Sequence, residues 1–430
     1  MSKERQNVYD ILKERGFVSQ VTDEDALRKL FDTEQVTCYI GFDPTANSLH
    51  AGSLVPIMSL MHMQRCGHLP IAVIGGGTSM VGDPSGKTEM RQMLTREKII
   101  ENGKALKAQL SKYIEFDDGN AIAVDNYDWL GELNYIDFLR DIGRHFSVNR
   151  MLTAESYKIR LETGLSFIEF NYQLLQSYDF LMLFKQHNCK LQMGGDDQWG
   201  NIVAGVDLVR RVESAEVEGV TFPLLTTATG EKMGKTAKGA LWLDAKKTSP
   251  YDFYQYWVNV DDRDVVKFLS FFTLLPMDEV RHVKKLSGAG LNNAKAVLAF
   301  EATKITHGED EARKALSAAA GAFGARIIPD SILPSSTIPR GSAEEQVSSV
   351  PTTEIEKSRF EEGIWVVSLF VEAGLVKSNG EARRLIKQGG AYLNEQRIDD
   401  ADATITLNHF EENAIMLRAG KKRYQRIVLE

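Results

Sequence analysis

The sequence predicts an α/β protein whose largest domain contains a mainly parallel β-sheet, followed by a helical domain and a small α+β domain. Two observations predict the sheet. Between about residues 36 and 230, short apolar runs alternate with longer helix-like stretches, the pattern of strands joined by crossover helices. Gly and polar residues follow these runs, as at Asp43, Gly75 and Gly194. Open parallel sheets bind ligands at the carboxyl ends of their strands, so we expect the functional site there.

The predicted elements of this domain follow in a regular order. The strand-like runs are TCYIGF at 37–42, LPIAVIGGG at 69–77, AIAVDN at 121–126 and KLQMGG at 190–195. Helix-like stretches follow the first two strands, at 54–64 and 95–113.

The remaining chain changes in composition. Residues 250 to about 325 have helical spacing of apolar residues, whereas 329–351 are rich in Ser, Pro, Thr and Glu, which is typical of a linker. We therefore predict four parts: a catalytic domain at 1–248, a helical domain at 249–328, a linker at 329–362 and a small terminal domain at 363–430.

Length and composition limit the class of protein. A chain of 430 residues exceeds one ordinary core, so two or three domains are expected. Hydrophobic residues make up 43% and charged residues 26%, which excludes a largely disordered or fibrous chain. Mean hydropathy is -0.24 and no run approaches the roughly 18 to 20 apolar residues of a helical span, so we expect no membrane association.

The cysteines and the first residues favour a reducing compartment. Cys38, Cys66 and Cys189 are widely spaced and include no C-x-x-C pair, so neither a disulfide framework nor a cysteine zinc site is predicted. We predict no metal site. The first 16 residues have a charged helical pattern without the apolar core of a secretion signal, so we expect a cytoplasmic protein.

The charge is unevenly distributed. The whole chain has a net charge of -8, which would repel nucleic acid, but the segment from Lys377 to the end carries 10 basic against 8 acidic residues. A contact with RNA would need a local basic patch, and the positive balance of this segment favours one here.

The first chemical cluster lies at residues 39–53, where a strand turns through a Pro/Asn/Ser loop into a helix. Such a turn directs backbone N–H groups and the positive end of a helix dipole at an anion. Thr45 and His50 add side-chain donors, and Gly52 lets a flat base approach the backbone.

The second cluster is a loop with two lysines. Neither a Walker A loop nor a dinucleotide fingerprint fits GGGTSMVGDPSGKT, because Val81 and Met80 stand where glycines are required. In contrast, Lys232-Met233-Gly234-Lys235-Thr236 offers two ammonium groups and a hydroxyl to a polyphosphate.

Together these segments resemble the bacterial tyrosyl-tRNA synthetases, a family of class I aminoacyl-tRNA synthetases, over nearly the whole chain. YIGFDPTANSLHAGS looks like the tyrosine-binding strand that runs into the HIGH signature, and KMGKT resembles the KMSKS loop. GDPSGKTEMR, DNYDW, YQLLQSYDF and GGDDQWGN resemble further family segments. Two departures stand out. HIGH appears as His50-Ala51-Gly52-Ser53, so Ser53 replaces the second histidine, and the third residue of KMSKS is Gly234.

The resemblance implies a Rossmann-like catalytic domain, a helical domain at 249–328 on the anticodon side of a bound tRNA, an S4-type RNA-binding domain and a homodimer. It implies L-tyrosine, ATP and tRNA(Tyr) as substrates, with Mg2+ on the ATP phosphates. Because the tyrosine carboxylate is already ionised at pH 7, its attack on the α-phosphate needs no general base. We therefore expect catalysis by positioning and by stabilisation of phosphate charge. The donors assigned to that charge are Thr45, His50, Lys87, Arg91, Lys232, Lys235 and Thr236.

The resemblance also assigns the substrate contacts. Tyr39 and Asp179 would bind the phenol, which would penalise phenylalanine because two buried polar groups would lose their partner. The tyrosine-binding residues are Tyr39, Gly41, Asp83, Tyr172, Gln176, Asp179 and Gln198. The ATP-binding residues are Asp43, Gly52, Ser53, Gly195, Asp197, Leu224, Leu225 and Lys235.

Two basic groups are expected to contact RNA phosphates, with Tyr392 or Tyr424 nearby. Arg383, Arg384 and Lys387 share one helical face, and Lys421, Lys422 and Arg423 form the second basic group.

Three alternatives remain open. A tryptophanyl-tRNA synthetase shares the fold, although Tyr39 paired with Asp179 disfavours it. The missing second histidine leaves room for an RNA-binding protein without catalysis. A different HIGH-type nucleotidyltransferase is disfavoured by the helical and S4-type regions.

Overall fold

The structure is a computed structural model that describes most of the chain. The described residues are 7–85, 94–230, 233–236, 239–323, 327–340, 352–394, 396–410, 414–420 and 423–430. The predicted site residues Lys87, Arg91, Lys232, Lys421 and Lys422 lie outside these ranges. For Lys235 and Thr236 only the backbone is described.

The chain forms two compact units. The first comprises Met1–Ser249, Asn259–Leu286 and Ile305–His307, and the second comprises Pro250–Val258, Ser287–Lys304 and Gly308–Glu430. The predicted helical segment at 249–328 therefore contributes residues to both units. The functions assigned to the four predicted parts stay predictions.

A six-stranded sheet forms the centre of the first unit. Its order is β1-β6-β5-β2-β3-β4, and β1 alone runs antiparallel to its neighbour. The strands are β1 Gln20–Val21, β2 Thr37–Phe42, β3 Leu69–Ile74, β4 Ile122–Asp125, β5 Cys189–Gly195 and β6 Glu218–Phe222. The chain starts the parallel set at β2, adds β3 and β4 on one side, and then returns to add β5 and β6 on the other. This reversal between β2 and β5 is the place where doubly wound sheets bind their ligands.

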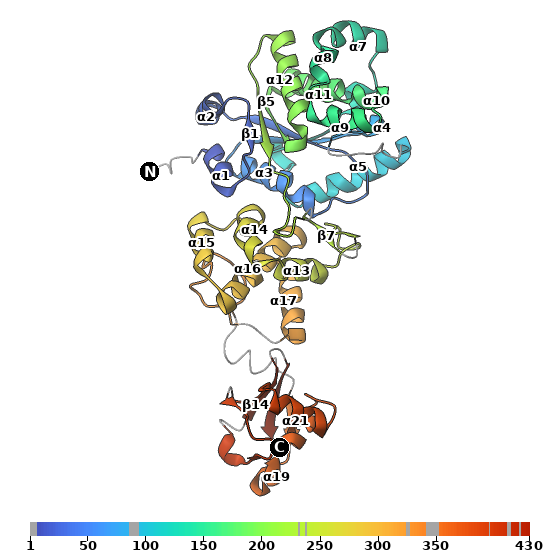
Figure 1. Ribbon diagram of the computed structural model, residues 1–430. Coiled ribbons are helices and arrows are strands. Elements are labelled where there is room, and N and C mark those ends of the chain that lie inside the picture. Colours follow the sequence, from blue (N-terminus) through green and yellow to red (C-terminus); the bar gives the residue numbers. More distant parts are fainter. Residues whose placement is uncertain are drawn as a thin grey trace. The chain divides into compact units, whose positions relative to one another are not determined.

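Helices cover both faces of this sheet, with α3 and α5 on one face and α11 and α12 on the other (Figure 1). Their bounds are α3 Leu54–Arg65, α5 Arg96–Leu110, α11 Tyr172–His187 and α12 Trp199–Glu213. Because both faces are covered, β2 and β3 are almost continuously apolar, which explains why these runs were recognisable in the sequence. Pro56 is the third residue of α3, where no intrahelical N–H bond is lost.

The core beneath α11 and α12 determines which side chains reach the site. Tyr39 and Val73 point into it and pack with Phe180 of α11. Gly41 lies two residues after Tyr39 and therefore on the same face of β2. It is exposed, so this face is uncovered at the carboxyl end of the central strand.

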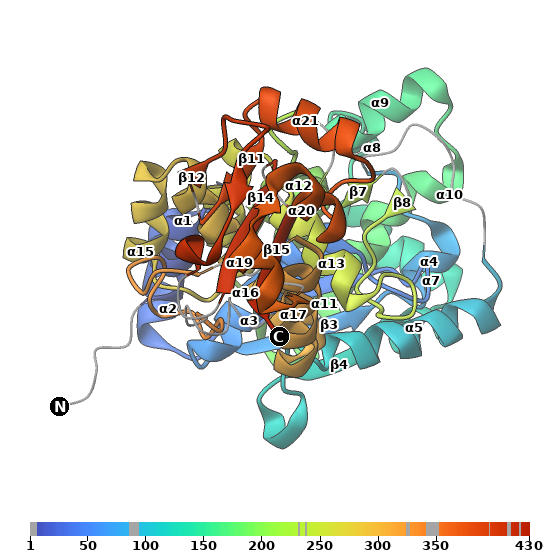
Figure 2. The same cartoon turned by 90° about the horizontal axis from the view of Figure 1, so that it is seen from below.

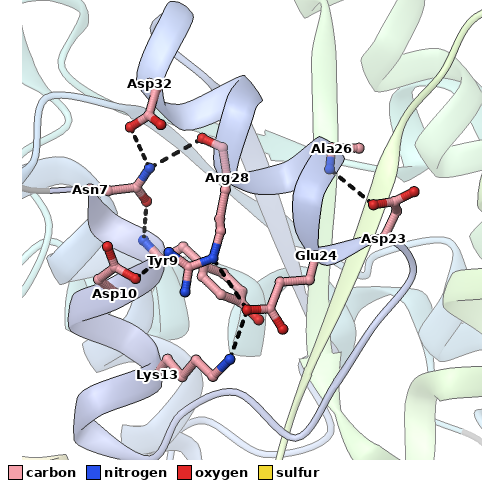
Figure 3. Close-up of polar contacts among 9 residues, drawn as sticks. All are labelled: Asn7, Tyr9, Asp10, Lys13, Asp23, Glu24, Ala26, Arg28 and Asp32. Carbon is pink, nitrogen blue, oxygen red and sulfur yellow. Dashed lines mark hydrogen bonds and ion pairs between the residues drawn. The ribbon is translucent and has the colours of Figure 1, made fainter.

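A polar cluster joins the first two helices, α1 Val8–Arg15 and α2 Glu24–Thr33 (Figure 3). Glu24 accepts hydrogen bonds from Lys13 at 2.7 Å and Arg28 at 3.2 Å. Strand β1 lies between these helices in the chain, so the cluster anchors the antiparallel edge of the sheet.

The second unit begins with helices. Its long helices are α13 Pro250–Val258, α16 Gly288–His307 and α17 Glu309–Phe323, whereas α14 Val265–Phe272 and α15 Met277–His282 belong to the first unit. Residues 327–340 pack on this helical part, because the hydroxyl of Ser336 donates to Glu301 at 2.5 Å and Ile338 is buried. The prediction of a linker at 329–362 is therefore wrong for its first part, because Ser336 makes a side-chain contact that composition does not reveal.

The end of the chain is an α+β domain. Its five-stranded sheet has the order β12-β11-β14-β15-β9, and β9 alone is parallel to its neighbour (Figure 2). The strands are β9 Thr352–Ile355, β11 Ala391–Leu393, β12 Gln396–Arg397, β14 Ala414–Ala419 and β15 Arg423–Leu429. The helices are α19 Lys357–Glu362, α20 Val366–Glu372 and α21 Asn379–Lys387.

This domain starts earlier than predicted. Strand β9 pairs with β15, and Phe360 of α19 is in the core of the domain, so 352–362 is no linker. A short strand rich in Thr is indistinguishable from a linker by composition alone. The predicted class, a parallel α/β domain with helical and small α+β parts, is confirmed. Among the described residues, no helix is long and apolar enough to cross a membrane.

Candidate active site

The predicted HIGH turn follows β2 and holds its histidine in a defined state. His50 caps the 3-10 turn Ala51–Ser53, with Nδ1 accepting the N–H of Gly52 at 3.0 Å. A Cβ at Gly52 would lie 2.7 Å from Cε1 of His50, so glycine is required here. Burial lowers the pKa of His50, which keeps the ring neutral at pH 7. Because Nδ1 accepts, the proton is assigned to Nε2, which can donate to a phosphate oxygen.

The loop of the predicted KMSKS type packs directly on this turn. Gly234 has φ 80°, and a Cβ there would lie 3.0 Å from the Cβ of Ala51. The N–H of Ala51 donates to the carbonyl of Leu241 at 2.8 Å, and the N–H of Leu241 donates to the carbonyl of Gly234 at 2.7 Å. The backbones of His50 and Trp242 form an isolated antiparallel β-bridge. The backbone of Lys235, in β7 Lys235–Thr236, therefore lies beside the HIGH turn as predicted.

The flanks of the turn are less constrained. Thr45 is exposed, and its N–H donates to the carbonyl of Asp43 at 2.8 Å. Ser53, which replaces the second histidine, donates its N–H to the carbonyl of His50 at 2.8 Å, and its side chain makes no capping hydrogen bond. The hydroxyls of both residues are therefore free of the helix cap.

The ends of three strands meet at Asp43. The hydroxyl of Thr78 donates to Oδ1 of Asp43 at 3.0 Å, and the phenol of Tyr172 donates to Oδ2 at 3.4 Å. Asn126, just after β4, donates to the hydroxyl of Thr78 at 3.0 Å. A Cβ at Gly75 would lie 2.1 Å from Oδ1 of Asp43, so glycine is needed for this close approach. A predicted ATP contact and a predicted tyrosine contact thus touch.

Two buried polar groups lie behind this meeting point. The hydroxyl of Tyr39 is buried and has no hydrogen-bond partner among the described residues. The carboxyl of Asp179 accepts hydrogen bonds from Nε1 of Trp129 at 2.7 Å and Nδ2 of Asn126 at 2.9 Å. Burial raises the pKa of Asp179 to about 7, although both hydrogen bonds act to lower it. Burial, with a contribution from Asp179, raises the pKa of Tyr39, so its hydroxyl stays protonated.

A second polar cluster connects three other predicted tyrosine contacts. Nδ2 of Asn201 donates to Gln176 and to Gln198, each at 3.1 Å. Nε2 of Gln198 donates to Oδ2 of Asp83 at 2.8 Å, and Oδ1 of Asp83 accepts the N–H of Ser85 at 2.8 Å. Helix α11 supplies Gln176, α12 supplies Asn201, and the 3-10 turn Asp196–Gln198 directly before α12 supplies Gln198, so the packing of α11 on α12 brings the cluster together.

The end of β5 forms a third surface. A Cβ at Gly195 would lie 2.6 Å from Oδ1 of Asp197 and 3.3 Å from Cδ2 of Leu224, so these three predicted nucleotide contacts adjoin. Leu224 is exposed, whereas Leu225 accepts the N–H of Met233 at 3.1 Å. The carboxylate of Asp196 instead accepts a hydrogen bond from the hydroxyl of Thr221 at 2.5 Å. Of the two consecutive aspartates, Asp197 is therefore the one whose side chain lies against Gly195.

A partly open pocket elsewhere is not the candidate site. It has a volume of about 210 Å³ and lies along α12, lined by His145, Met151, Trp199, Arg211 and neighbouring residues. It contains none of the predicted site residues, and its charges Arg150 and Asp207 neutralise each other at 2.5 Å. The candidate site therefore lies at the uncovered strand ends, where the predicted site residues are.

Sequence reasoning missed several side chains of the site. Thr78, Asn126, Trp129 and Asn201 hold the predicted residues in place through the hydrogen bonds above. Asn126 directly follows a predicted strand, and this position could have identified it. Trp129 and Asn201 lie in the quoted segments DNYDW and GGDDQWGN, but neither was singled out, because their partners Asp179 and Gln176 lie on an element distant in the sequence.

The described basic residues of the terminal domain are exposed on α21. Arg383 lies 5.1 Å from the ring of Trp365, and Arg384 and Lys387 face solvent. Arg423 instead donates to the carbonyl of Leu375 at 2.6 Å, so part of its hydrogen-bonding capacity is used within the domain.

Pairing across the terminal sheet places aromatic and basic side chains in one row. Tyr392 pairs with Arg397 on one side and with Arg418 on the other, and Arg418 pairs with Tyr424. The guanidinium of Arg418 lies 3.5 Å from the centre of the Tyr392 ring and 5.9 Å from that of Tyr424. The sequence analysis named the two tyrosines but missed Arg418, which only the strand register identifies.

Comparison with known proteins gives a consistent family. Residues 32–324 match the family described as tRNA synthetases class I (W and Y), and residues 342–427 match the Tyrosine--tRNA ligase SYY-like C-terminal domain. The second match begins before the predicted boundary at 363, in agreement with the position of β9.

Individual relatives cover nearly the whole chain. Tyrosine--tRNA ligase of Syntrophus aciditrophicus is 60% identical over 425 residues, covering 99% of both chains. That of Desulfosudis oleivorans is 60% identical over 428 residues, covering 98% of this chain and 99% of the relative. Among solved structures, a C-terminally truncated mitochondrial tyrosyl-tRNA synthetase of Aspergillus nidulans superposes with a TM-score of 0.65 at 31% identity, covering 72% of this chain and 92% of the other.

Proposed function

This chain belongs to the class I tRNA synthetases, among the tyrosine–tRNA ligases, and we propose that it joins L-tyrosine to tRNA(Tyr). In the first step the tyrosine carboxylate attacks the α-phosphate of ATP, which forms tyrosyl-adenylate and releases pyrophosphate. In the second step a hydroxyl at the 3′ end of the tRNA attacks the tyrosyl carbonyl and releases AMP.

One observation carries the choice of tyrosine. The buried hydroxyl of Tyr39 lacks a partner among the described residues, and the buried carboxyl of Asp179 lies close enough to raise its pKa. A phenolic hydroxyl supplies the partner that Tyr39 lacks, since it accepts from Tyr39, and it donates a further hydrogen bond to Asp179. Phenylalanine would leave the hydroxyl of Tyr39 buried without a partner, which costs about 1 to 3 kcal/mol, whereas Asp179 would keep its hydrogen bonds from Trp129 and Asn126.

The ammonium and carboxylate of the substrate require the second polar cluster. Asp83 supplies a negative charge and Gln176 an amide oxygen, both within one hydrogen-bonded group. We assign the ammonium to these residues with Tyr172, and the carboxylate to the neighbourhood of Gln198. Gly41 belongs to this site because its lack of a side chain leaves the strand face open.

ATP lies on the other side of the strand ends in this proposal. The neutral imidazole of His50 donates from Nε2 to the phosphates, and the backbone of Gly52 lies against the nucleotide. Gly195, Asp197 and Leu224 are adjacent, which fits a ribose bound beside an adenine. Asp43, Ser53, Thr45 and Leu225 complete the nucleotide site, and Lys87, Arg91, Lys232, Lys235 and Thr236 complete the phosphate donors.

The described residues form no metal cage. No group of three or more His, Cys, Asp or Glu side chains among them is arranged to hold a metal ion. We propose that Mg2+ enters with ATP, bound to its phosphates as part of the substrate.

We assign tRNA binding to the terminal domain, as an S4-type module. Exposed Arg383, Arg384 and Lys387 share α21 and suit phosphate contacts, and Lys421, Lys422 and Arg423 form the second basic group. In this division of labour residues 1–248 activate tyrosine, and the helical part at 249–328 contacts the anticodon side of the tRNA.

An exposed apolar surface supports a homodimer. Large apolar side chains protrude from consecutive short helices, α7 Tyr135–Asp141, α8 Val148–Met151, α9 Glu155–Thr163 and α10 Phe167–Phe170. They are Tyr135, Ile136, Leu139, Val148, Leu161, Phe167 and Ile168. Phe167 is 70% exposed, and such a group of side chains is costly to leave in water. We infer that a second copy of the chain covers them, in the cytoplasm, where ATP and tRNA are available.

Exchange of labelled pyrophosphate into ATP tests the proposal. It measures the first step alone and is carried out with tyrosine, tryptophan and phenylalanine in turn. We expect exchange with tyrosine, and exchange with tryptophan instead would favour the tryptophanyl alternative. Absence of exchange with every amino acid, combined with tight binding of tRNA, would favour the alternative of an RNA-binding protein without catalysis.

A further inference from the structure

Helices α9 and α10 form a hairpin that is fastened by a buried ion pair. Nη2 of Arg160 donates to both carboxylate oxygens of Glu169 at 3.0 Å, and the two side chains are only 3% and 4% exposed. Glu169 also accepts the N–H of Ser166 at 3.2 Å and its hydroxyl at 2.8 Å. The pair therefore fixes both the distance between the helices and the first turn of α10.

Stability alone is a poor explanation for this pair. Removing two charges from water costs about as much as their mutual attraction returns, and apolar residues of similar volume often serve equally well. Buried pairs of this kind are more easily explained where they define one geometry. The pair is absent from the hydrogen bonds of the substrate clusters described above, so any role in the reaction is indirect.

The inner side of the hairpin supports the site of the substrate ammonium. The hydroxyl of Tyr157 in α9 donates to the carbonyl of Phe170 at 2.9 Å, and their rings pack at 5.3 Å. Burial raises the pKa of Tyr157, to which the nearby carboxyl of Asp83 adds. Two residues after Phe170, Tyr172 begins α11 and reaches Asp43.

The start of the hairpin also abuts α12. A Cβ at Gly200 would lie 3.3 Å from the Cβ of Ala154, directly before α9. The next residue, Asn201, connects Gln176 and Gln198. A displacement of the hairpin would therefore move Tyr172, the surroundings of Asp83 and the start of α12 together.

We propose that Arg160 and Glu169 are positioning residues for tyrosine binding: their ion pair holds the α9–α10 hairpin as the back wall of the ammonium site. This inference rests on the proposed roles of Asp83, Gln176 and Tyr172. The nucleotide residues His50 and Gly195 lie on other segments of the chain, whereas Asp43 accepts a hydrogen bond from Tyr172. Loss of the pair therefore raises KM for tyrosine much more than KM for ATP.

The main test replaces both partners by apolar residues, Arg160→Met with Glu169→Leu, in the full chain. This variant leaves no unpaired buried charge, so it is expected to fold. In pyrophosphate exchange we expect KM for tyrosine to rise about tenfold or more, because small misplacements of binding groups have large effects. KM for ATP should stay within about twofold. Unchanged constants, or an equal rise of both, would overturn the proposal.

Conservative and control variants sharpen the result. Arg160→Lys keeps the charge but not the planar fork, so its KM for tyrosine should lie between those of the wild type and the double variant. Lys185→Gln removes an exposed ion pair with Glu213, at the far end of α11, and should change neither constant. If Arg160→Lys is no better than the double variant, charge pairing does not position the hairpin.

Two further measurements separate the rival explanations. KM for tyrosine is measured at two enzyme concentrations tenfold apart, because Phe167 of the same hairpin belongs to the exposed apolar surface. Positioning predicts equal values, and a KM that falls with concentration would attribute the effect to weakened self-association and overturn the proposal. Asp83→Asn should raise KM for tyrosine by itself. If it does so while the ion-pair variants do not, only this inference fails; if it does not, the proposed ammonium site fails with it.

Discussion

Replacing Asp179 by asparagine tests the most unusual electrostatic feature of the site. Its carboxyl is fully buried, and burial raises its pKa from the ordinary 3.8 to about 7. An asparagine side chain at this position would have nearly the same shape and no charge. The substitution thus isolates the free energy of burying a carboxylate at this position, where Trp129 and Asn126 donate hydrogen bonds to it.

The sign and size follow from proton linkage. Between pH 3.8 and about 7 the unfolded chain has lost the proton of Asp179 while the folded chain retains it. Unfolding therefore releases a proton, and the stability of the wild type falls as the pH rises through this window and levels off above about 7. From pH 5 to pH 8 the loss covers about two pH units, each worth about 1.4 kcal/mol, or about 3 kcal/mol in total. The asparagine variant lacks this loss.

Urea unfolding of both proteins at pH 5 and pH 8, followed by circular dichroism, measures the effect. Other buried groups titrate equally in both proteins and cancel in the difference. We expect the variant to gain about 3 kcal/mol over the wild type between the two pH values. With urea slopes of about 1 to 3 kcal/mol per M, the separation of the midpoints grows by about 1 to 3 M. A separation independent of pH would refute the assigned burial of the charge.

Three further predictions concern the signature loop and the terminal domain. Gly234→Ala should slow adenylate formation, because φ 80° costs a non-glycine residue about 1 to 2 kcal/mol and the methyl group would press on Ala51; a rate equal to wild type in single-turnover kinetics would contradict the close packing of loop and turn. Lys235→Ala should slow the same step while tyrosine binding, measured by equilibrium dialysis, stays intact, and an unchanged rate would remove Lys235 from the mechanism. Deleting residues 341–430 should spare pyrophosphate exchange and impair charging of tRNA. Equal loss of both activities would mean that the terminal domain is structural. The deletion starts before β9, because cutting at 363 would leave β9 without its partner strand β15.

The sequence alone determined the class of fold and the segments of the site. Strands β2 and β3 are covered on both faces, so their apolar runs were continuous and recognisable. Gly or polar residues mark the carboxyl ends of the strands: Asp43 follows β2, Gly75 follows β3, and Gly194 lies in the last two residues of β5. The boundaries after residue 328 were not predictable in this way. Burial of Ile338 and pairing of β9 depend on partners that composition does not reveal.

Only the tertiary structure decided how the segments cooperate. Asn126, Trp129 and Asn201 hold predicted residues through hydrogen bonds across 25 to 53 positions of sequence. The ion pair of Arg160 and Glu169 is recognised only when the helices that it joins are packed together. The position of Arg418 between two tyrosines is set by the strand register. The spacing of apolar residues along one strand or helix shows which of its faces are buried. Hydrogen bonds between distant elements leave no periodic trace, because each partner is chosen by the packing of the whole unit.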